Sequence, residues 1–391
     1  MSMDFLEAVE EQLVTATERG ISRRRWRWPW LMRMRLPWRA PTIGIAAGVG
    51  AALAASALAA TLTLPASKPK SHVSTVAGLS PMRSYTTTGP VPAAFQPQSF
   101  TAISEFTWWL LGTAPCGGHS CAAIVQTTDG GPHFTRIPAP PTGQVTNLRF
   151  ADGSNGYAYG QQLWSTHNDG ASWTQLHLGT AIDDLAIADG YAYAIAFSHG
   201  RGRLMRSPVS RDAWTALPRV RAGLLSGLWV QGPTVFIQSG SHLLVSNDQG
   251  THFRRVGGVR HAGDCSYDGG LQALWALCST GMAPDEVLLS SDGGNTFRAA
   301  AQVPDGPINS FGAADGTIAV ASGQGPLFRT TNGGATWTRV SAPSAAWTYI
   351  GFSDPTHGVA LGNFGTGGHQ QNRLYYTING GQSYHLVQIG S

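Results

Sequence analysis

The sequence predicts an all-β protein whose main domain is a seven-bladed β-propeller. Three observations support this fold class: an eight-residue motif recurs along the chain, its copies are about 40 residues apart, and short β-like stretches precede each copy. A period near 40 residues with four short strands per repeat is typical of one propeller blade. The 49 glycines and 23 prolines among the 391 residues agree with a chain that contains many hairpins.

The motif reads Ser or Thr, any residue, Asp or Asn, any residue, Gly, any residue, Thr, Ser or His, and an aromatic residue. Six copies are complete, and the residues at their third positions are Asp129, Asn168, Asp248, Asp292, Asn332 and Asn379. A seventh copy, at 207–214, keeps only the first serine and the final tryptophan, and successive copies are 39 to 47 residues apart. In such a hairpin glycine supplies a positive φ, and the Asp or Asn side chain caps the amides of the turn.

These copies resemble the Asp-box (bacterial neuraminidase) repeat of a family of β-propellers, and the resemblance covers roughly residues 100–391. The family includes sialidases, other propeller glycosidases, sortilin-type receptors and photosystem II assembly factors. With seven blades, the expected architecture is most similar to that of the photosystem assembly factors. The resemblance implies a fold and not an activity, because the box is a structural element throughout the family.

A transmembrane helix is predicted ahead of the repeats. Residues 42–64 carry no charge and lie between Pro41 and Pro65, and 23 helical residues are long enough to cross a bilayer core of about 30 Å. The preceding arm is rich in arginine and tryptophan, which places the N-terminus in the cytoplasm and the repeats outside. A cleaved signal peptide is the alternative, although its apolar segment is usually only about 7–15 residues long.

The chain therefore divides into four expected parts, with the propeller on the extracytoplasmic side of the cell membrane. They are a basic cytoplasmic arm at 1–41 with an amphipathic helix at 4–19, a single transmembrane helix at 42–64, a Pro/Ser/Thr-rich linker at 65–98 and the propeller at 99–391. Residues 1–40 carry a net charge of +3, whereas residues 71–391 carry −1. Because the positive charge is confined to the arm, the propeller is not expected to bind nucleic acid.

The four cysteines form two local pairs in the sequence, Cys116 with Cys121 and Cys265 with Cys278. Neither pair has the spacing of a zinc site, so we expect neither a metal nor another cofactor. Each pair brackets a predicted hairpin, and two local disulfides fit an oxidising exterior. Four buried free thiols are the alternative.

A sialidase-like activity would require particular residues. The resemblance implies three arginines for the substrate carboxylate, a tyrosine nucleophile with a glutamate partner, and an aspartate near the glycosidic oxygen. Beyond the linker only two glutamates occur, Glu105 and Glu286, and neither is near a tyrosine in sequence. Arg136 begins an Arg-Ile-Pro triplet similar to one in sialidases, but it follows a repeat instead of preceding them all, so we interpret it as structural.

An aspartate-based glycosidase stays open as an alternative. Some aspartates fall outside the boxes and the turns that follow the innermost strands, and these are Asp183, Asp184, Asp264, Asp285 and Asp305. No zinc-protease, serine-triad or phosphate-loop signature is present. The sequence therefore favours a non-catalytic binding or assembly scaffold over an exo-acting glycosidase, whether sialidase-like or aspartate-based, and no catalytic residue is assigned.

A ligand is expected on the propeller face opposite the boxes, where the loops between blades and between second and third strands gather. Basic and polar residues cluster in those loops: Arg201, Arg203, Arg219, Arg221, Arg260, His261, His369 and Arg373. They predict a rim that binds a protein segment or an anionic glycan. The alternative is that they are ordinary solvated loop residues.

Overall fold

A computed structural model of the chain describes eleven ranges between residues 83 and 390. They are 83–179, 181–198, 201–217, 225–239, 242–256, 264–270, 273–279, 285–304, 306–323, 325–365 and 370–390. The predicted helices at 4–19 and 42–64 lie outside these ranges. Every regular element in the described ranges is a strand, and these ranges contain no helix that could span a membrane.

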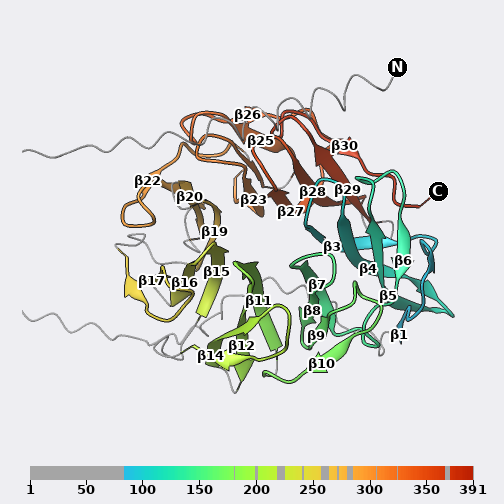
Figure 1. The fold of residues 1–391 in the computed structure, drawn as a ribbon. Coiled ribbons are helices and arrows are strands. Elements are labelled where there is room, and N and C mark those ends of the chain that lie inside the picture. Colours follow the sequence, from blue (N-terminus) through green and yellow to red (C-terminus); the bar gives the residue numbers. More distant parts are fainter. Residues whose placement is uncertain are drawn as a thin grey trace, which may run out of the picture. The chain divides into compact units, whose positions relative to one another are not determined.

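The strands form seven sheets, which confirms the predicted seven-bladed propeller (Figure 1). Blade 1 contains β3 (Gln96–Ala102), β4 (Trp108–Cys116), β5 (His119–Thr127) and β6 (Thr135–Ile137). Blade 2 contains β7 (Val145–Phe150), β8 (Gly156–Gly160), β9 (Leu163–Thr166) and β10 (Thr174–Leu176). Blade 3 contains β11 (Ala181–Ala188), β12 (Tyr191–Ser198), β13 (Arg201–Pro208) and β14 (Thr215–Ala216).

The remaining blades have the same order of four antiparallel strands. Blade 4 contains β15 (Leu225–Gln231), β16 (Thr234–Ser239), β17 (His242–Ser246) and β18 (Arg254–Arg255). Blade 5 contains β19 (Asp264–Gly270), β20 (Ala273–Ser279), β21 (Glu286–Ser290) and β22 (Arg298–Ala299). Blade 6 contains β23 (Ser310–Ala313), β24 (Ala319–Ser322), β25 (Leu327–Thr330) and β26 (Thr338–Arg339). Blade 7 contains β27 (Ala346–Phe352), β28 (Gly358–Phe364), β29 (Gln371–Thr377) and β30 (His385–Leu386).

The first strand of each blade lies innermost and the fourth outermost (Figure 1). Second strands are buried on both sides because neighbouring sheets pack face to face, and they are therefore continuous apolar runs such as Trp108–Leu111. The antiparallel order puts the connections between first and second strands at the same end as the hairpins between third and fourth strands. We call this end the repeat face, because it carries the motif copies, and the other end the opposite face.

The six complete motif copies share one hydrogen-bond pattern. The first hydroxyl donates to Oδ1 of the third residue at 2.7–3.0 Å. That hydroxyl accepts from the N–H of the glycine at 2.8–3.1 Å. The same Oδ1 accepts from the N–H of the seventh residue at 2.9–3.2 Å. The Asp and Asn residues at the third positions therefore close the hairpins, as the sequence predicts.

The seventh copy is held in a different way. The hydroxyl of Ser207 donates to the carbonyl oxygen of Arg211 at 2.7 Å, so a backbone group takes the place of the missing carboxylate or amide. Asp212 in the same hairpin accepts the hydroxyl of Ser165 at 2.8 Å and lies 3.2 Å from Nε2 of His167. Since Ser165 and His167 belong to blade 2, the degenerate hairpin is tied to the neighbouring blade.

The ring closes without exchanging a strand, because each blade is built from one continuous stretch of chain. Gln96 of blade 1 accepts the N–H of Asn372 of blade 7 at 2.7 Å, and Phe95 and Val387 are buried in one apolar cluster. Part of the segment predicted as a linker forms two short strands, β1 (Arg83–Ser84) and β2 (Gly89–Pro90), which pair with the outer part of blade 1. Residues 83–98 thus belong to the propeller.

Both predicted disulfides are formed. Cys116 and Cys121 join the ends of β4 and β5, with their Cα atoms 5.8 Å apart. Cys265 and Cys278 are directly opposite each other on β19 and β20, with a Cα separation of 4.1 Å, and both are buried. Each disulfide is therefore local and fastens one hairpin.

Candidate functional site

A cavity of about 860 Å³ occupies the centre of the ring, and the innermost strands of all seven blades contribute to its wall. At the repeat face its lining extends outward to Ser104–Phe106 of blade 1 and to Ser353 and His357 of blade 7. Gly130 and Ile378, from the repeat hairpins of the same two blades, complete this mouth. This mouth thus lies at the repeat face, at the junction of blades 1 and 7.

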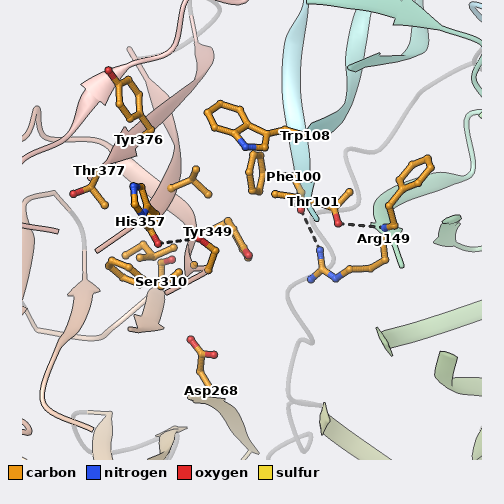
Figure 2. A pocket seen from close by; sticks show the side chains of 18 of the residues that line it. Phe100, Thr101, Trp108, Arg149, Asp268, Ser310, Tyr349, His357, Tyr376 and Thr377 are labelled. Carbon is orange, nitrogen blue, oxygen red and sulfur yellow. Dashed lines mark hydrogen bonds between the residues drawn. The ribbon is translucent and has the colours of Figure 1, made fainter. Parts of the chain in front are cut away.

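Three charged side chains occupy the wall at the level of the innermost strands: Arg149 on β7, Asp184 on β11 and Asp268 on β19. Figure 2 shows Arg149 and Asp268 on different sides of the cavity, with Tyr349 of β27 between the mouth and its centre. Each of the three lies on the innermost strand of its blade, which borders the axis of the ring. Their positions on the strands therefore direct them to the axis of the ring.

Irregular strand pairing helps to place the side chains of Asp184 and Tyr349 in the cavity wall. In β11 the register shifts between Ile182 and Asp184, so that Asp183 is exposed and Asp184 faces the cavity. In β27 the register shifts between Trp347 and Tyr349, which leaves Trp347 buried between sheets and Tyr349 in the cavity wall. Bulges commonly re-aim a side chain in this way.

Arg149 is fixed by the backbone and not by an ion pair. Its Nη1 donates to the carbonyl oxygens of Phe100 and Leu148, both at 3.2 Å. The nearby phenol of Tyr159 raises the pKa of Arg149, burial opposes this effect, and Asp184 adds to it. The guanidinium therefore remains charged inside the channel.

The two cavity aspartates accept hydrogen bonds from the next blade. Oδ2 of Asp184 accepts the N–H of Leu228 at 3.2 Å, and Oδ2 of Asp268 accepts the N–H of Ala313 at 2.8 Å. Burial raises the pKa of Asp184 to about 6, although Arg149 opposes the shift. Burial also raises the pKa of Asp268. Ionising either carboxyl inside the channel therefore costs free energy.

Elsewhere in the ring, neutral side chains make the same kind of hydrogen bond between the innermost strands of neighbouring blades. The hydroxyls of Ser99 and Thr101 in blade 1 accept the N–H groups of Leu148 and Phe150 in blade 2, at 3.0 and 3.2 Å. A hydroxyl is therefore sufficient to connect two innermost strands. The charges of Asp184 and Asp268 are not explained by this structural role alone.

Large apolar side chains surround the mouth of the cavity. Phe106 and Ile378 are 56% and 58% exposed, which is unusual for side chains of this size in a packed sheet protein. Below them Trp108 is buried, and its Nε1 donates to the carbonyl oxygen of Ser104 at 3.2 Å. The junction of blades 1 and 7 therefore offers an exposed apolar contact directly beside the polar channel.

The predicted rim on the opposite face is only partly described. Arg201 and Arg203 are exposed on blade 3, and Arg373 is exposed on blade 7, 5.5 Å from the ring centre of Phe364. None of the three lines the central cavity. The other predicted rim residues, Arg219, Arg221, Arg260, His261 and His369, lie outside the described ranges. The rim stays a prediction.

The cavity differs from the arrangement that a sialidase requires. Among its described lining residues Arg149 is the single arginine, and Glu105 lies at the mouth, 4.0 Å from Nε2 of His357. Arg136 is far from the axis on β6, where its Nε donates to the carbonyl oxygen of Thr87 at 2.9 Å. In the described part of the chain no three His, Cys, Asp or Glu side chains are grouped to hold a metal.

Replacing Asp184 with asparagine should stabilise the protein at neutral pH. Its carboxyl has a pKa of about 6 in the folded state against 3.8 as the reference value, so its contribution to stability is full below about pH 4 and is lost as the pH rises through 6. Two pK units correspond to at most about 3 kcal/mol of stability. We expect a smaller gain, about 1–2 kcal/mol at pH 7.5, because an amide oxygen accepts the N–H of Leu228 less strongly than a carboxylate does. Urea unfolding at pH 7.5 and pH 4 measures this, and an equal gain at both values would contradict the assignment.

No family model and no curated protein matches the chain. Among solved structures, YCF48 bound to a D1 peptide is similar, with 18% sequence identity and a TM-score of 0.55 over 76% of this chain and 99% of that chain. YCF48 from Cyanidioschyzon merolae is similar to the same degree, with 16% identity and a TM-score of 0.53 over 75% of this chain and 98% of that chain.

A puromycin-hydrolyzing peptidase from Mycobacterium tuberculosis also matches, with 13% identity and a TM-score of 0.56. That match covers 78% of this chain but only 56% of the peptidase chain. At these identities the likenesses establish a shared propeller fold and nothing about activity.

Proposed function

We propose that this protein is a non-catalytic scaffold that binds a segment of a partner protein in its central cavity. The observation that carries the proposal is the cavity itself, which combines a volume typical of ligand sites with aromatic walls and a few charged groups. The similar YCF48 propeller bound to a D1 peptide supports it, because a ring of this architecture has a peptide as its partner there. We also assign the repeats to the Asp-box type, which their common hydrogen-bond pattern supports.

The proposal includes the membrane anchor. The uncharged stretch at 42–64 and the arginine-rich arm before it favour a single-pass protein with the propeller outside the cytoplasm. The two disulfides support an oxidising compartment. Protease treatment of intact and of opened cells tests this orientation, because a propeller outside the cytoplasmic membrane is cleaved in both. Protection in intact cells would contradict it.

A variant that fills the cavity tests the binding site. Ser266 is an exposed cavity-lining residue on β19, so Ser266→Trp should block the channel without removing a hydrogen bond. Random peptides displayed on phage and selected on the full-length protein in lipid nanodiscs should bind the wild type and lose binding to this variant. Thr174→Trp, on the exposed outer strand β10, is the matched control and should bind as the wild type does. Equal binding by Ser266→Trp would place the site elsewhere.

A second proposed site is the arginine rim of the opposite face. Its support is the number of basic loop residues there, including the exposed Arg201 and Arg203. Replacing Arg201, Arg203, Arg219 and Arg221 with serine should abolish salt-dependent capture of an acidic glycan or peptide. Unchanged capture would exclude the rim.

A glycosidase is the alternative function that one observation favours. Asp184 and Asp268 share a cavity, and a carboxyl group with a raised pKa can act as a general acid. Turnover of fluorogenic glycosides by the purified protein, abolished by Asp184→Asn or Asp268→Asn, would establish this activity. Absence of turnover across a panel of exo-substrates leaves the scaffold as the conclusion.

A further inference from the structure

The charges along the cavity do not balance. Its described lining contains one guanidinium, that of Arg149, and four carboxylates, those of Glu105, Asp129, Asp184 and Asp268. Asp129 already has a partner, because its Oδ2 lies 2.6 Å from Nδ1 of His133 in the repeat hairpin. Arg149 can compensate only one of the others. The cavity therefore holds more acidic than basic groups, and a bound cation would favour the ionised forms of Asp184 and Asp268, whose pKa values burial raises.

Asp268 is the carboxylate without a cationic neighbour. Its oxygens accept the N–H groups of Gly269 and Ala313, both at 2.8 Å, and in the described part of the chain no Lys, Arg or His forms an ion pair with it. A carboxylate offers about four lone-pair sites, so two remain after these bonds. Figure 2 shows the carboxyl group directed into the cavity. The phenol of Tyr349 is the titratable group that lies near it.

Aromatic rings also line the cavity. Trp229 comes from the innermost strand of blade 4, Phe311 from that of blade 6, and Tyr349 from that of blade 7. The faces of such rings attract ammonium and guanidinium groups, and this attraction is larger where water is excluded. A cation held in the cavity can therefore meet the carboxylate of Asp268, the ring of Tyr349 near it and the other aromatic side chains of the wall.

We propose that Asp268 binds the Lys or Arg side chain of the partner segment while an apolar residue of that segment packs on Phe106 and Ile378 at the mouth. This inference rests on the proposed function and names the chemistry that the cavity selects. The excess of carboxylates argues for a basic side chain, and the exposed rings of the mouth argue for an apolar neighbour. The segment expected in the cavity is thus a basic-apolar peptide, whereas the separate arginine rim would take an acidic ligand.

The peptide selection described above tests this inference with further variants. Among peptides from a random library that bind the full-length wild type, Lys or Arg beside an apolar residue should be enriched. Asp268→Asn should weaken their binding about 10-fold or more, because it removes the charge that pairs with the ligand. Asparagine keeps one acceptor oxygen for the N–H of Ala313 and loses the bond to the N–H of Gly269, so urea unfolding of the variant must show that the folded state persists. Asp183→Asn removes the same charge from an exposed position outside the cavity and should bind as the wild type does.

The outcomes distinguish the cation site at Asp268 from the broader proposal that the cavity binds a peptide. Enriched peptides without Lys or Arg, or equal binding by Asp268→Asn, would overturn the cation site, even if Ser266→Trp still abolished binding and so supported the cavity. Loss of binding that Asp183→Asn shares would show a general charge effect and would also overturn it. If the library yields no peptide that Ser266→Trp rejects, both the cation site and the proposed function fail.

Discussion

Replacing Trp109 with alanine is expected to lower the free energy of unfolding by about 4 kcal/mol. The side chain is fully buried between blades 1 and 2, and its ring stacks on that of Phe150 with the centroids 4.0 Å apart. Its Nε1 also donates to Oδ1 of Asp169 at 3.2 Å. Alanine would remove the stack and the hydrogen bond and would leave a cavity between two sheets. Equilibrium unfolding in urea measures the difference.

Two further variants identify the source of this loss. Trp109→Phe keeps an aromatic ring on Phe150 and should lose only about 1–2 kcal/mol, from the smaller volume and the missing hydrogen bond. Trp173 lies at the edge of the same cluster and is only partly buried, so Trp173→Ala should cost less than Trp109→Ala. A loss below 2 kcal/mol for Trp109→Ala would show that the two blades do not depend on this contact.

Removing the disulfide of blade 5 should destabilise the protein by about 3 kcal/mol. Cys265 and Cys278 are 13 residues apart, and the entropy of closing a loop of that length accounts for a loss of this size. Both sulfurs are buried, and the N–H of Cys265 also donates to Gln238 of blade 4 at 2.9 Å. The double variant Cys265→Ala/Cys278→Ala, compared with the wild type in urea, measures the effect.

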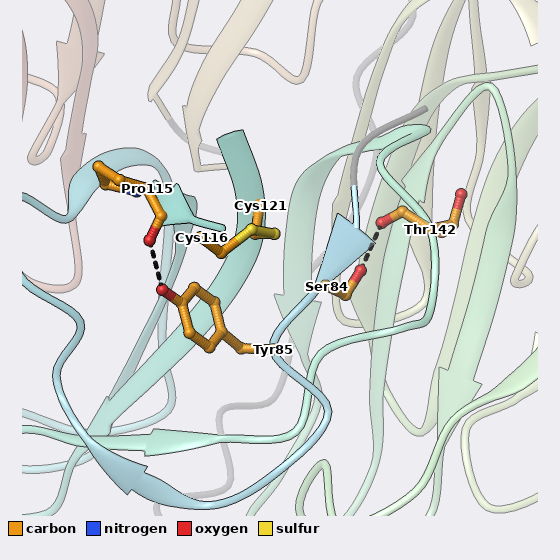
Figure 3. The surroundings of a disulfide bond; sticks show 6 residues. All are labelled: Ser84, Tyr85, Pro115, Cys116, Cys121 and Thr142. Atoms are coloured by element: carbon orange, nitrogen blue, oxygen red, sulfur yellow. Dashed lines mark hydrogen bonds between the residues drawn. A yellow bond between two sulfur atoms is a disulfide. The ribbon is translucent and has the colours of Figure 1, made fainter. Parts of the chain in front are cut away.

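The second disulfide is the matched control. Cys116 and Cys121 are only five positions apart in the sequence, so their removal should cost about 2 kcal/mol. Figure 3 shows why this end of blade 1 should hold without it: the hydroxyl of Tyr85 donates to the carbonyl oxygen of Pro115 at 2.6 Å, and that of Ser84 donates to the carbonyl oxygen of Thr142 at 3.0 Å. If removing the pair in blade 1 cost more than removing the pair in blade 5, loop length would not determine the ranking.

The blades could be predicted because each one repeats the same local chemistry. A hydroxyl, an Asp or Asn and a glycine at fixed spacing fold a hairpin by themselves, so six copies at one period locate six blades. The degenerate copy was located by its spacing although Ser207 bonds to a backbone carbonyl. β1 and β2 could not be predicted as part of blade 1, because each is two residues long and pairs only through contacts distant in sequence.

The cavity was harder to predict because it exists only once the ring is closed. Asp184 was one of five aspartates left open, but Arg149 and Asp268 were missed, since neighbouring residues in sequence do not show which side chains converge on an axis. The strands themselves give little signal, because β7 and β19 are rich in polar or small residues. Bulges such as that between Ile182 and Asp184 then decide which of two adjacent acids turns inward. Their position depends on tertiary packing.

A ring built from contiguous blades has no preferred starting point. A cut between two blades would sever no strand pairing, because no sheet borrows a strand from the far end of the chain. The two ends of the propeller also meet, since Gly390 lies against the side chain of Val91. Joining those ends and opening the chain between other blades should yield circular permutants with the same seven sheets. The identity of the first blade is therefore a matter of gene order and not of architecture.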